Sequence, residues 1–148
     1  MLAKELIQFI EKSVNDSTFL EFLEINNFDT KKLPNQERKK QKAEVATFLL
    51  QGIELCFTFE NNQLQLYRII FFKPKSDGLQ NTPQIDYPFG LYLNQKKSDY
   101  ETILGNFVGF DEPQSRDYHF KNYAVTINFE PSDEDKKIKI IEISMKKN

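Results

Sequence analysis

Few side chains in this sequence are of the types that enzymes use for nucleophilic, acid–base or metal chemistry. His119 is the only histidine and Cys56 the only cysteine. Acid–base catalysis or zinc binding by histidine would have to rest on His119, which alternates with aromatic residues at a position expected to face solvent. Cys56 lies in the middle of an expected strand, not at a helix N-terminus that would activate a thiol. The sequence therefore predicts no catalytic residue, no metal site and no cofactor.

Two clusters of acidic residues are the remaining candidates for a site. Asp133, Glu134 and Asp135 fall in an expected loop between two strands, and Asp111 and Glu112 follow an expected helix. Their spacing does not fit a calcium loop, which needs oxygen ligands at alternating positions around a central glycine. Such charges can be merely solvated, or they can contact a partner protein.

A basic run extends from Lys31 to Lys42, and it could in principle bind nucleic acid by releasing counterions. Glu37 and several amide side chains dilute the run, and it contains no aromatic residue on which a base could stack. The whole chain has a formal net charge of −2. The sequence favours a solvated loop here and predicts no nucleic-acid partner.

The 148 residues predict one domain with an aromatic-rich core, since 14 residues are Phe and 6 are Tyr. The N-terminal segment carries Glu5 and Glu11 among its apolar residues, so it lacks the apolar centre of a signal peptide. No other run reaches the length that spans a membrane. These features indicate a cytoplasmic protein that does not contact membranes.

The elements that would position these residues follow from an alternating segment that occurs twice. The first copy runs from Gly52 to Phe72 and the second from Tyr123 to Met145. In each, a rising strand ends on Phe-Glu, and the apolar phase of the return strand slips by one residue, after Leu66 and after Ile140. A shared slip predicts a β-bulge in both return strands. The apolar positions of the rising strands are Ile53, Leu55, Phe57 and Phe59, and Tyr123, Val125, Ile127 and Phe129.

Helical spacing precedes both copies. An amphipathic helix is expected from Leu2 to about Val14, and a second begins at Ser17 with Asp16 or Ser17 as its cap and ends near Asn26. A capping box at Ser98 and Glu101 predicts a third helix, which Gly105 ends.

The predicted fold is α+β: two helix-plus-three-stranded-meander repeats, residues 17–72 and 98–145, forming one antiparallel sheet with helices on one face. Residues 73–88 connect the two repeats. Val45 to Leu50 is the expected first strand of one repeat, and the segment around Tyr118 and Phe120 is that of the other.

A series of short motifs follows the first hairpin. They are Tyr87-Pro88-Phe89-Gly90-Leu91, Ser98 with Ile103-Leu104-Gly105, Pro113-x-Ser115, Tyr118, Tyr123-x-Val125-x-Ile127-x-Phe129 and Ile138-x-Ile140-Ile141-x-Ile143. With these motifs, the chain from about Gly52 to Met145 resembles small bacterial immunity proteins of polymorphic-toxin and contact-dependent-inhibition loci. Where such proteins often carry Trp before the last hairpin, this chain has Tyr118 or Phe120.

This resemblance implies a protein that binds and neutralises a cognate toxin domain without catalysis. Toxins of this kind are often basic nucleases, so we expect Asp133, Glu134 and Asp135 first, and Asp111 and Glu112 second, to contribute to the contact. The alternative is an intracellular adaptor or ligand-binding module that uses the open sheet face.

Overall fold

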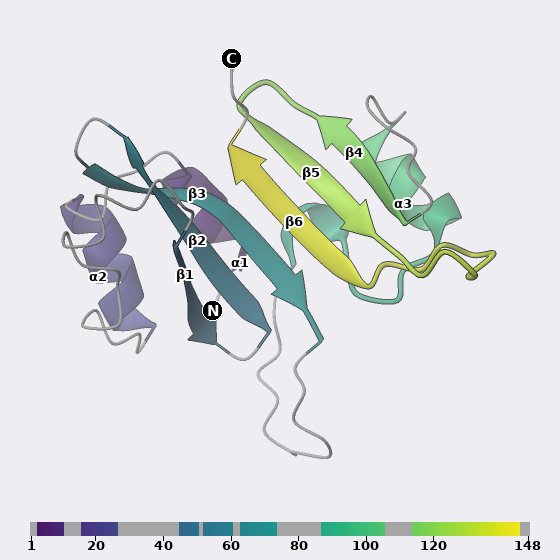
Figure 1. Ribbon diagram of the computed structural model, residues 1–148, viewed down its shortest axis with the longest axis horizontal. Coiled ribbons are helices and arrows are strands. Elements are labelled where there is room, and N and C mark those ends of the chain that lie inside the picture. The colour runs from purple at the N-terminus through teal and green to yellow at the C-terminus, as the bar shows by residue number, and fades with distance from the viewer. Residues whose placement is uncertain are drawn as a thin grey trace.

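A computed structural model describes residues 3–10, 16–26, 45–50, 52–60, 63–73, 87–105 and 114–145. The fold is α+β, as predicted, with one antiparallel sheet (Figure 1). The strands are β1 (Val45–Leu50), β2 (Ile53–Glu60), β3 (Gln63–Phe72), β4 (Ser115–His119), β5 (Tyr123–Asn128) and β6 (Ile140–Met145). The helical elements are α1 (Ala3–Leu6), η1 (Ile7–Phe9), α2 (Ser17–Ile25), η4 (Pro88–Gly90) and α3 (Lys97–Leu104).

The six strands lie in the order β1-β2-β3-β6-β5-β4. Strands β1 to β3 form one antiparallel meander and β4 to β6 form another. The two meanders meet where β3 pairs with β6, with Ile69 opposite Ile143 and Phe71 opposite Ile141. The basic run 31–42, most of the connection 73–88, and Asp111 and Glu112 lie outside the described residues.

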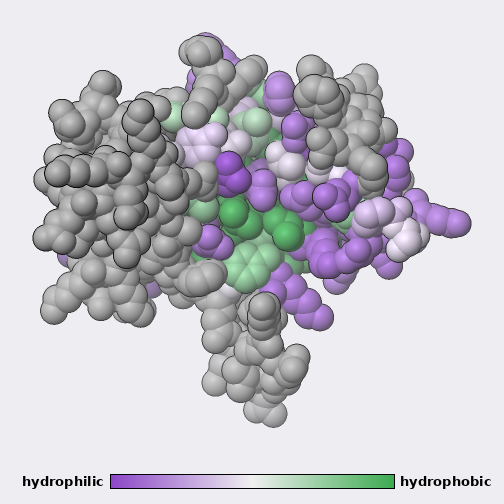
Figure 2. All heavy atoms as spheres, viewed as in Figure 1, coloured by the Kyte–Doolittle hydropathy of each residue, from purple (hydrophilic) through white to green (hydrophobic). Residues whose placement is uncertain are grey.

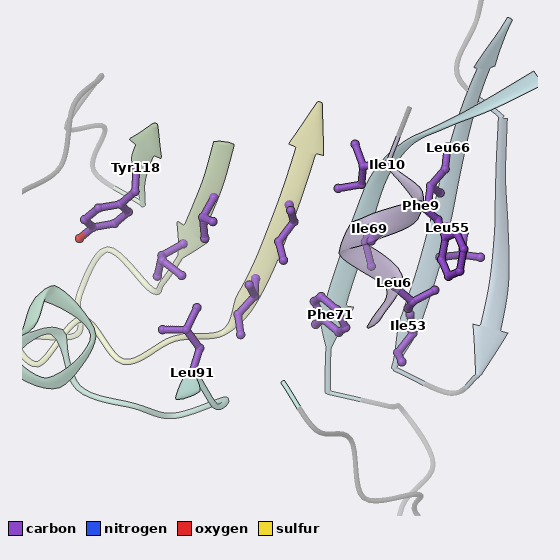
Figure 3. Packing of buried hydrophobic residues seen from close by; sticks show 14 of the residues in the cluster. Leu6, Phe9, Ile10, Ile53, Leu55, Leu66, Ile69, Phe71, Leu91 and Tyr118 are labelled. Atoms are coloured by element: carbon purple, nitrogen blue, oxygen red, sulfur yellow. The ribbon is translucent and has the colours of Figure 1, made fainter. Parts of the chain in front are cut away.

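One face of the sheet is apolar across five strands, because successive side chains of a strand point to opposite faces. The helical elements contribute buried side chains to the same cluster: Phe19 of α2 lies 6.4 Å from Phe57, centroid to centroid, and Phe9 lies 5.0 Å from Phe19. Figure 3 shows Leu6 and Phe9 beside β2 and β3. The strand residues of this core face are Ile53, Leu55, Phe57, Leu66, Ile69, Phe71, Tyr118, Val125, Ile127, Ile141 and Ile143.

The predicted bulge is present in the first return strand and absent from the second. Cys56 pairs with Arg68 and Phe57 with Leu66, so Tyr67 is the extra residue of β3. In β6 the prediction is wrong, because the register with β5 runs without a shift from Met145 to Ile140. The buried Ile138 precedes the strand, and its amide donates to the Gln95 carbonyl at 3.0 Å instead of pairing with β5.

The helix ends agree in part with the sequence. Asp16 caps α2 by accepting from the Phe19 amide at 3.1 Å, and Gly105, with φ 82°, ends α3. The capping box is wrong: α3 begins at Lys97, so Ser98 lies inside the helix. Glu101 instead forms an ion pair with Arg116.

The expected first helix is shorter than predicted. α1 covers Ala3–Leu6 and continues only as the 3-10 turn η1, while residues 11–15 lie outside the described part.

The core face makes a direct prediction about stability. Leu55 is fully buried, so Leu55→Ala should lower the free energy of unfolding by about 2–5 kcal/mol, through lost burial and the cavity that remains. Glu54→Ala, the neighbouring position on the opposite face, should change it by no more than about 0.5 kcal/mol. Urea denaturation measures both, and equal effects would contradict the assignment of faces.

Candidate functional site

The acidic residues Asp133, Glu134 and Asp135 lie in the loop between β5 and β6. The Asp133 carboxylate organises this loop: Oδ1 accepts from the Asp135 amide and Oδ2 from the Lys137 amide, both at 3.0 Å. The Asp133 amide donates to the Glu130 carbonyl at 3.0 Å. Both carboxylate oxygens of Asp133 are therefore used within the loop, while Glu134 and Asp135 are exposed.

The loop is attached to α3 and to the segment that precedes it. The Lys97 amide donates to the Asp135 carbonyl at 3.0 Å, and the Asn94 amide donates to the Ile138 carbonyl at 2.8 Å. The hydroxyl of the buried Tyr100 donates to the Lys136 carbonyl at 2.9 Å. Contacts between segments about 40 residues apart thus fix a loop that sequence reasoning treated as a free connection.

The charge around the acidic residues is mixed. Lys136 and Lys137 follow directly in the loop, and the Lys136 ammonium lies 5.3 Å from the Phe129 ring centroid. Lys97 contacts the loop through its main-chain amide. That Glu134 and Asp135 contact a partner stays a prediction; Asp133 has a structural role that the sequence did not reveal.

Substitutions can separate the structural role of Asp133 from the predicted partner contact of the exposed residues beside it. Asp133→Ala should lower the free energy of unfolding by about 1–2 kcal/mol, because two backbone amides lose their acceptor. Glu134→Ala, in the same loop but exposed, should have an effect below about 0.5 kcal/mol. Thermal or urea unfolding of the two variants gives the comparison, and an Asp133→Ala protein as stable as Glu134→Ala would refute the structural role.

The most buried group of polar side chains lies between α3 and β4. Arg116 is 5% exposed and pairs with Glu101, beside Tyr100 and the 1% exposed Tyr118. Burial raises the pKa of Tyr100 well above its usual range, and Tyr118 adds to the shift. Arg116, Tyr100 and Tyr118 are buried, whereas the Glu101 side chain is 35% exposed, so the ion pair joins the buried cluster to the surface of α3. The group is structural.

Tyr100 also predicts how stability depends on pH. Its pKa is higher in the folded than in the unfolded chain, so its contribution to stability is complete below about pH 10 and declines as the pH rises further. Burial raises the pKa of Tyr87 and Tyr123 as well, and these residues add to the decline.

Tyr100→Phe should therefore lower stability at neutral pH by about 1 kcal/mol, through the lost hydrogen bond, and weaken the alkaline decline. Urea denaturation at pH 7 and pH 11 measures both effects. Tyr92→Phe, at an exposed ring, is the control. An unchanged alkaline decline in Tyr100→Phe would contradict the burial of a neutral phenol.

The two remaining candidate residues from the sequence, His119 and Cys56, lie on different strands. His119 is exposed at the end of β4, and Cys56 is 2% exposed in the middle of β2. Across the described ranges, no three His, Cys, Asp or Glu side chains gather closely enough to hold a metal ion. A search of the same ranges found no helix with the length and apolar character needed to cross a membrane.

The face of the sheet opposite the core has an apolar centre. Ile70 of β3 lies on this face, as do Phe72 and its cross-strand partner Ile140, and all three are partly exposed. α1 lies behind the sheet in the view of Figure 1, and Figure 2, from the same side, shows hydrophobic side chains in the middle with hydrophilic ones beside them. We call this surface the open face. The sequence indicates this surface through the run Ile69-Ile70-Phe71-Phe72, in which both alternating sets of residues are apolar, so that both faces of the strand receive apolar side chains.

The rim of the open face is acidic. The described strand residues there include three carboxylates, Glu54, Asp117 and Glu142, and one guanidinium, Arg68, which gives a formal charge of −2. Arg68 lies 4.0 Å from Glu142, and Asp117 accepts from the Thr126 hydroxyl at 2.8 Å. The open face thus combines partly exposed apolar side chains with fixed negative charge.

Phe89 of η4 stacks on two rings near the turn between β4 and β5, Phe120 and Tyr123, which also pack against the core. The centroid of Phe89 lies 5.7–6.0 Å from those of the other two rings, and the rings are nearly parallel. Phe89 has φ 62°, a strained left-handed conformation for a residue with a Cβ, and Gly90 follows with φ 77°. Stacking of this kind contributes about 0.5–1.5 kcal/mol per pair, which offsets the strain.

Comparison of the chain with protein-family models, with curated proteins and with solved structures found no match.

Proposed function

We propose that this protein binds a partner protein through the open face and performs no reaction itself. The observation that carries the proposal is the arrangement of that face, in which Ile70, Phe72 and Ile140 lie inside a charged and polar rim. Protein–protein interfaces have this composition, with an apolar centre that loses its water and a polar border. Apolar residues that gather at a surface inside a polar border often mark an interaction site.

We propose that the partner is a basic protein, namely a toxin domain that is neutralised in the cytoplasm. The formal charge of −2 on the open face supports a basic partner, because complementary charge accelerates association and disfavours other proteins. The choice of a toxin as the partner follows from the resemblance of the sequence to immunity proteins. An adaptor that binds another basic protein would use the same face, and identification of the partner distinguishes the two.

We further propose that the two halves of the chain are repeats of one unit. In support, each half contains a helix followed by an antiparallel meander, and the strand order is symmetric about the β3–β6 pair. The open face would then be built from equivalent strands of both units. The bulge at Tyr67 has no counterpart in β6, so the repeats would have diverged there.

A charge placed in the centre of the open face tests the function. Ile70→Glu should weaken binding of the toxin domain encoded beside the gene by about thirtyfold or more, because a carboxylate would have to be desolvated at the contact. The matched control is Ile103→Glu, which makes the same change at an exposed position of α3 and should leave the affinity unchanged.

Titration calorimetry gives the affinities, circular dichroism verifies that both variants are folded, and survival of cells producing the toxin gives the biological readout. Equal binding by a folded Ile70→Glu protein would remove the open face from the proposal. If the wild type neither binds nor protects against an adjacent toxin, the immunity function is wrong.

A further inference from the structure

The open face ends in a hollow where β5 and β6 run into their connecting loop. The hollow has a volume of about 390 Å³, within the range of pockets that hold one small group. Asn128, Ile140 and Glu142 belong both to the hollow and to the open face. The hollow is therefore continuous with the surface that we propose as the interface.

The walls of the hollow differ in chemistry from one another. Ile140 and Pro131 supply accessible apolar surface, and Asn128, Glu130 and Glu142 supply oxygen acceptors. An apolar wall can contact an aliphatic stem, while carboxylates at the end of that stem can accept from a cation. This combination fits a long side chain that is apolar along its length and positively charged at its tip.

Each of the two carboxylates has a cationic side chain of the same protein beside it. Lys139, which also lines the hollow, is paired with Glu130. Glu142 lies 4.0 Å from Arg68, toward β3. Each carboxylate has several lone pairs and can accept from a second donor in addition to its present partner. With two carboxylates and one ammonium on its walls, the hollow has a formal charge of −1.

We infer that the hollow receives an arginine side chain of the partner protein. A guanidinium is planar and donates two parallel hydrogen bonds to one carboxylate, and its flat face packs on apolar or aromatic surface more readily than an ammonium does. Arginine is also enriched among the residues that dominate protein–protein affinity. This inference rests on the proposed function and names the contact that anchors the basic partner.

The inference can be tested without the partner. N-acetyl-L-arginine amide is titrated into the full chain and followed by two-dimensional NMR, with N-acetyl-L-citrulline amide as the neutral analogue of the same shape. The arginine compound should shift the signals of Asn128, Phe129 and Ile140, and the citrulline compound should not. Glu142→Gln should weaken binding of the arginine compound by about tenfold, because the hollow loses a charged acceptor. Glu134→Gln removes an equal charge from the adjacent loop and should change little.

The outcomes separate this inference from the proposed function. Equal shifts with both compounds, shifts confined to other regions, or unchanged binding in Glu142→Gln would overturn the arginine site. If Ile70→Glu still abolishes binding of the toxin domain in that case, the open face remains the interface. If the arginine compound binds as expected while Ile70→Glu binds the toxin normally, the hollow is a guanidinium site and the proposed interface is wrong.

Discussion

The pairing of β3 with β6 is the interaction on which the rest of the structure depends. In the described part of the chain each meander has three strands, and β3 and β6 would be exposed edges without each other. Five residue pairs, from Arg68 opposite Ser144 to Phe72 opposite Ile140, close these edges. The same pairs place Ile69 and Phe71 beside Ile143 and Ile141, so the two half-cores become one. On the opposite side they create the apolar centre of the open face.

The outer edge at β4 is protected in a different way. Arg116 points from this strand toward the core face, and a charge directed inward discourages pairing with a further strand. Its ion pair with Glu101 connects β4 to α3, while the loop at Asp133 is bonded to the segment before the same helix. Removal of Glu101 would leave the buried Arg116 guanidinium without this partner, so the contact favours one arrangement of α3 and the second meander.

The two faces of the sheet have separate consequences. The core face is covered and supplies stability, whereas the open face retains Ile70, Phe72 and Ile140 at the surface beside fixed carboxylates. A rigid sheet presents such groups in a defined geometry, so little conformational entropy would be lost on binding of the partner that we propose. The face of a six-stranded sheet is broad enough for a macromolecule, and the hollow at its end has room for one inserted side chain.

The sequence by itself determined the features that depend on neighbouring residues. Alternation placed Ile53, Leu55 and Phe57 on one face, a break in that alternation located the bulge at Tyr67, and Asp16 and Gly105 marked helix ends. Only the tertiary structure decided the features that join distant segments. Glu101 pairs with Arg116 rather than capping its helix, Ile138 bonds to Gln95, and the loop of Asp133 is attached before α3. A local sequence pattern does not depend on which distant residue a side chain will contact. Those contacts are decided only when the strands assemble into the sheet.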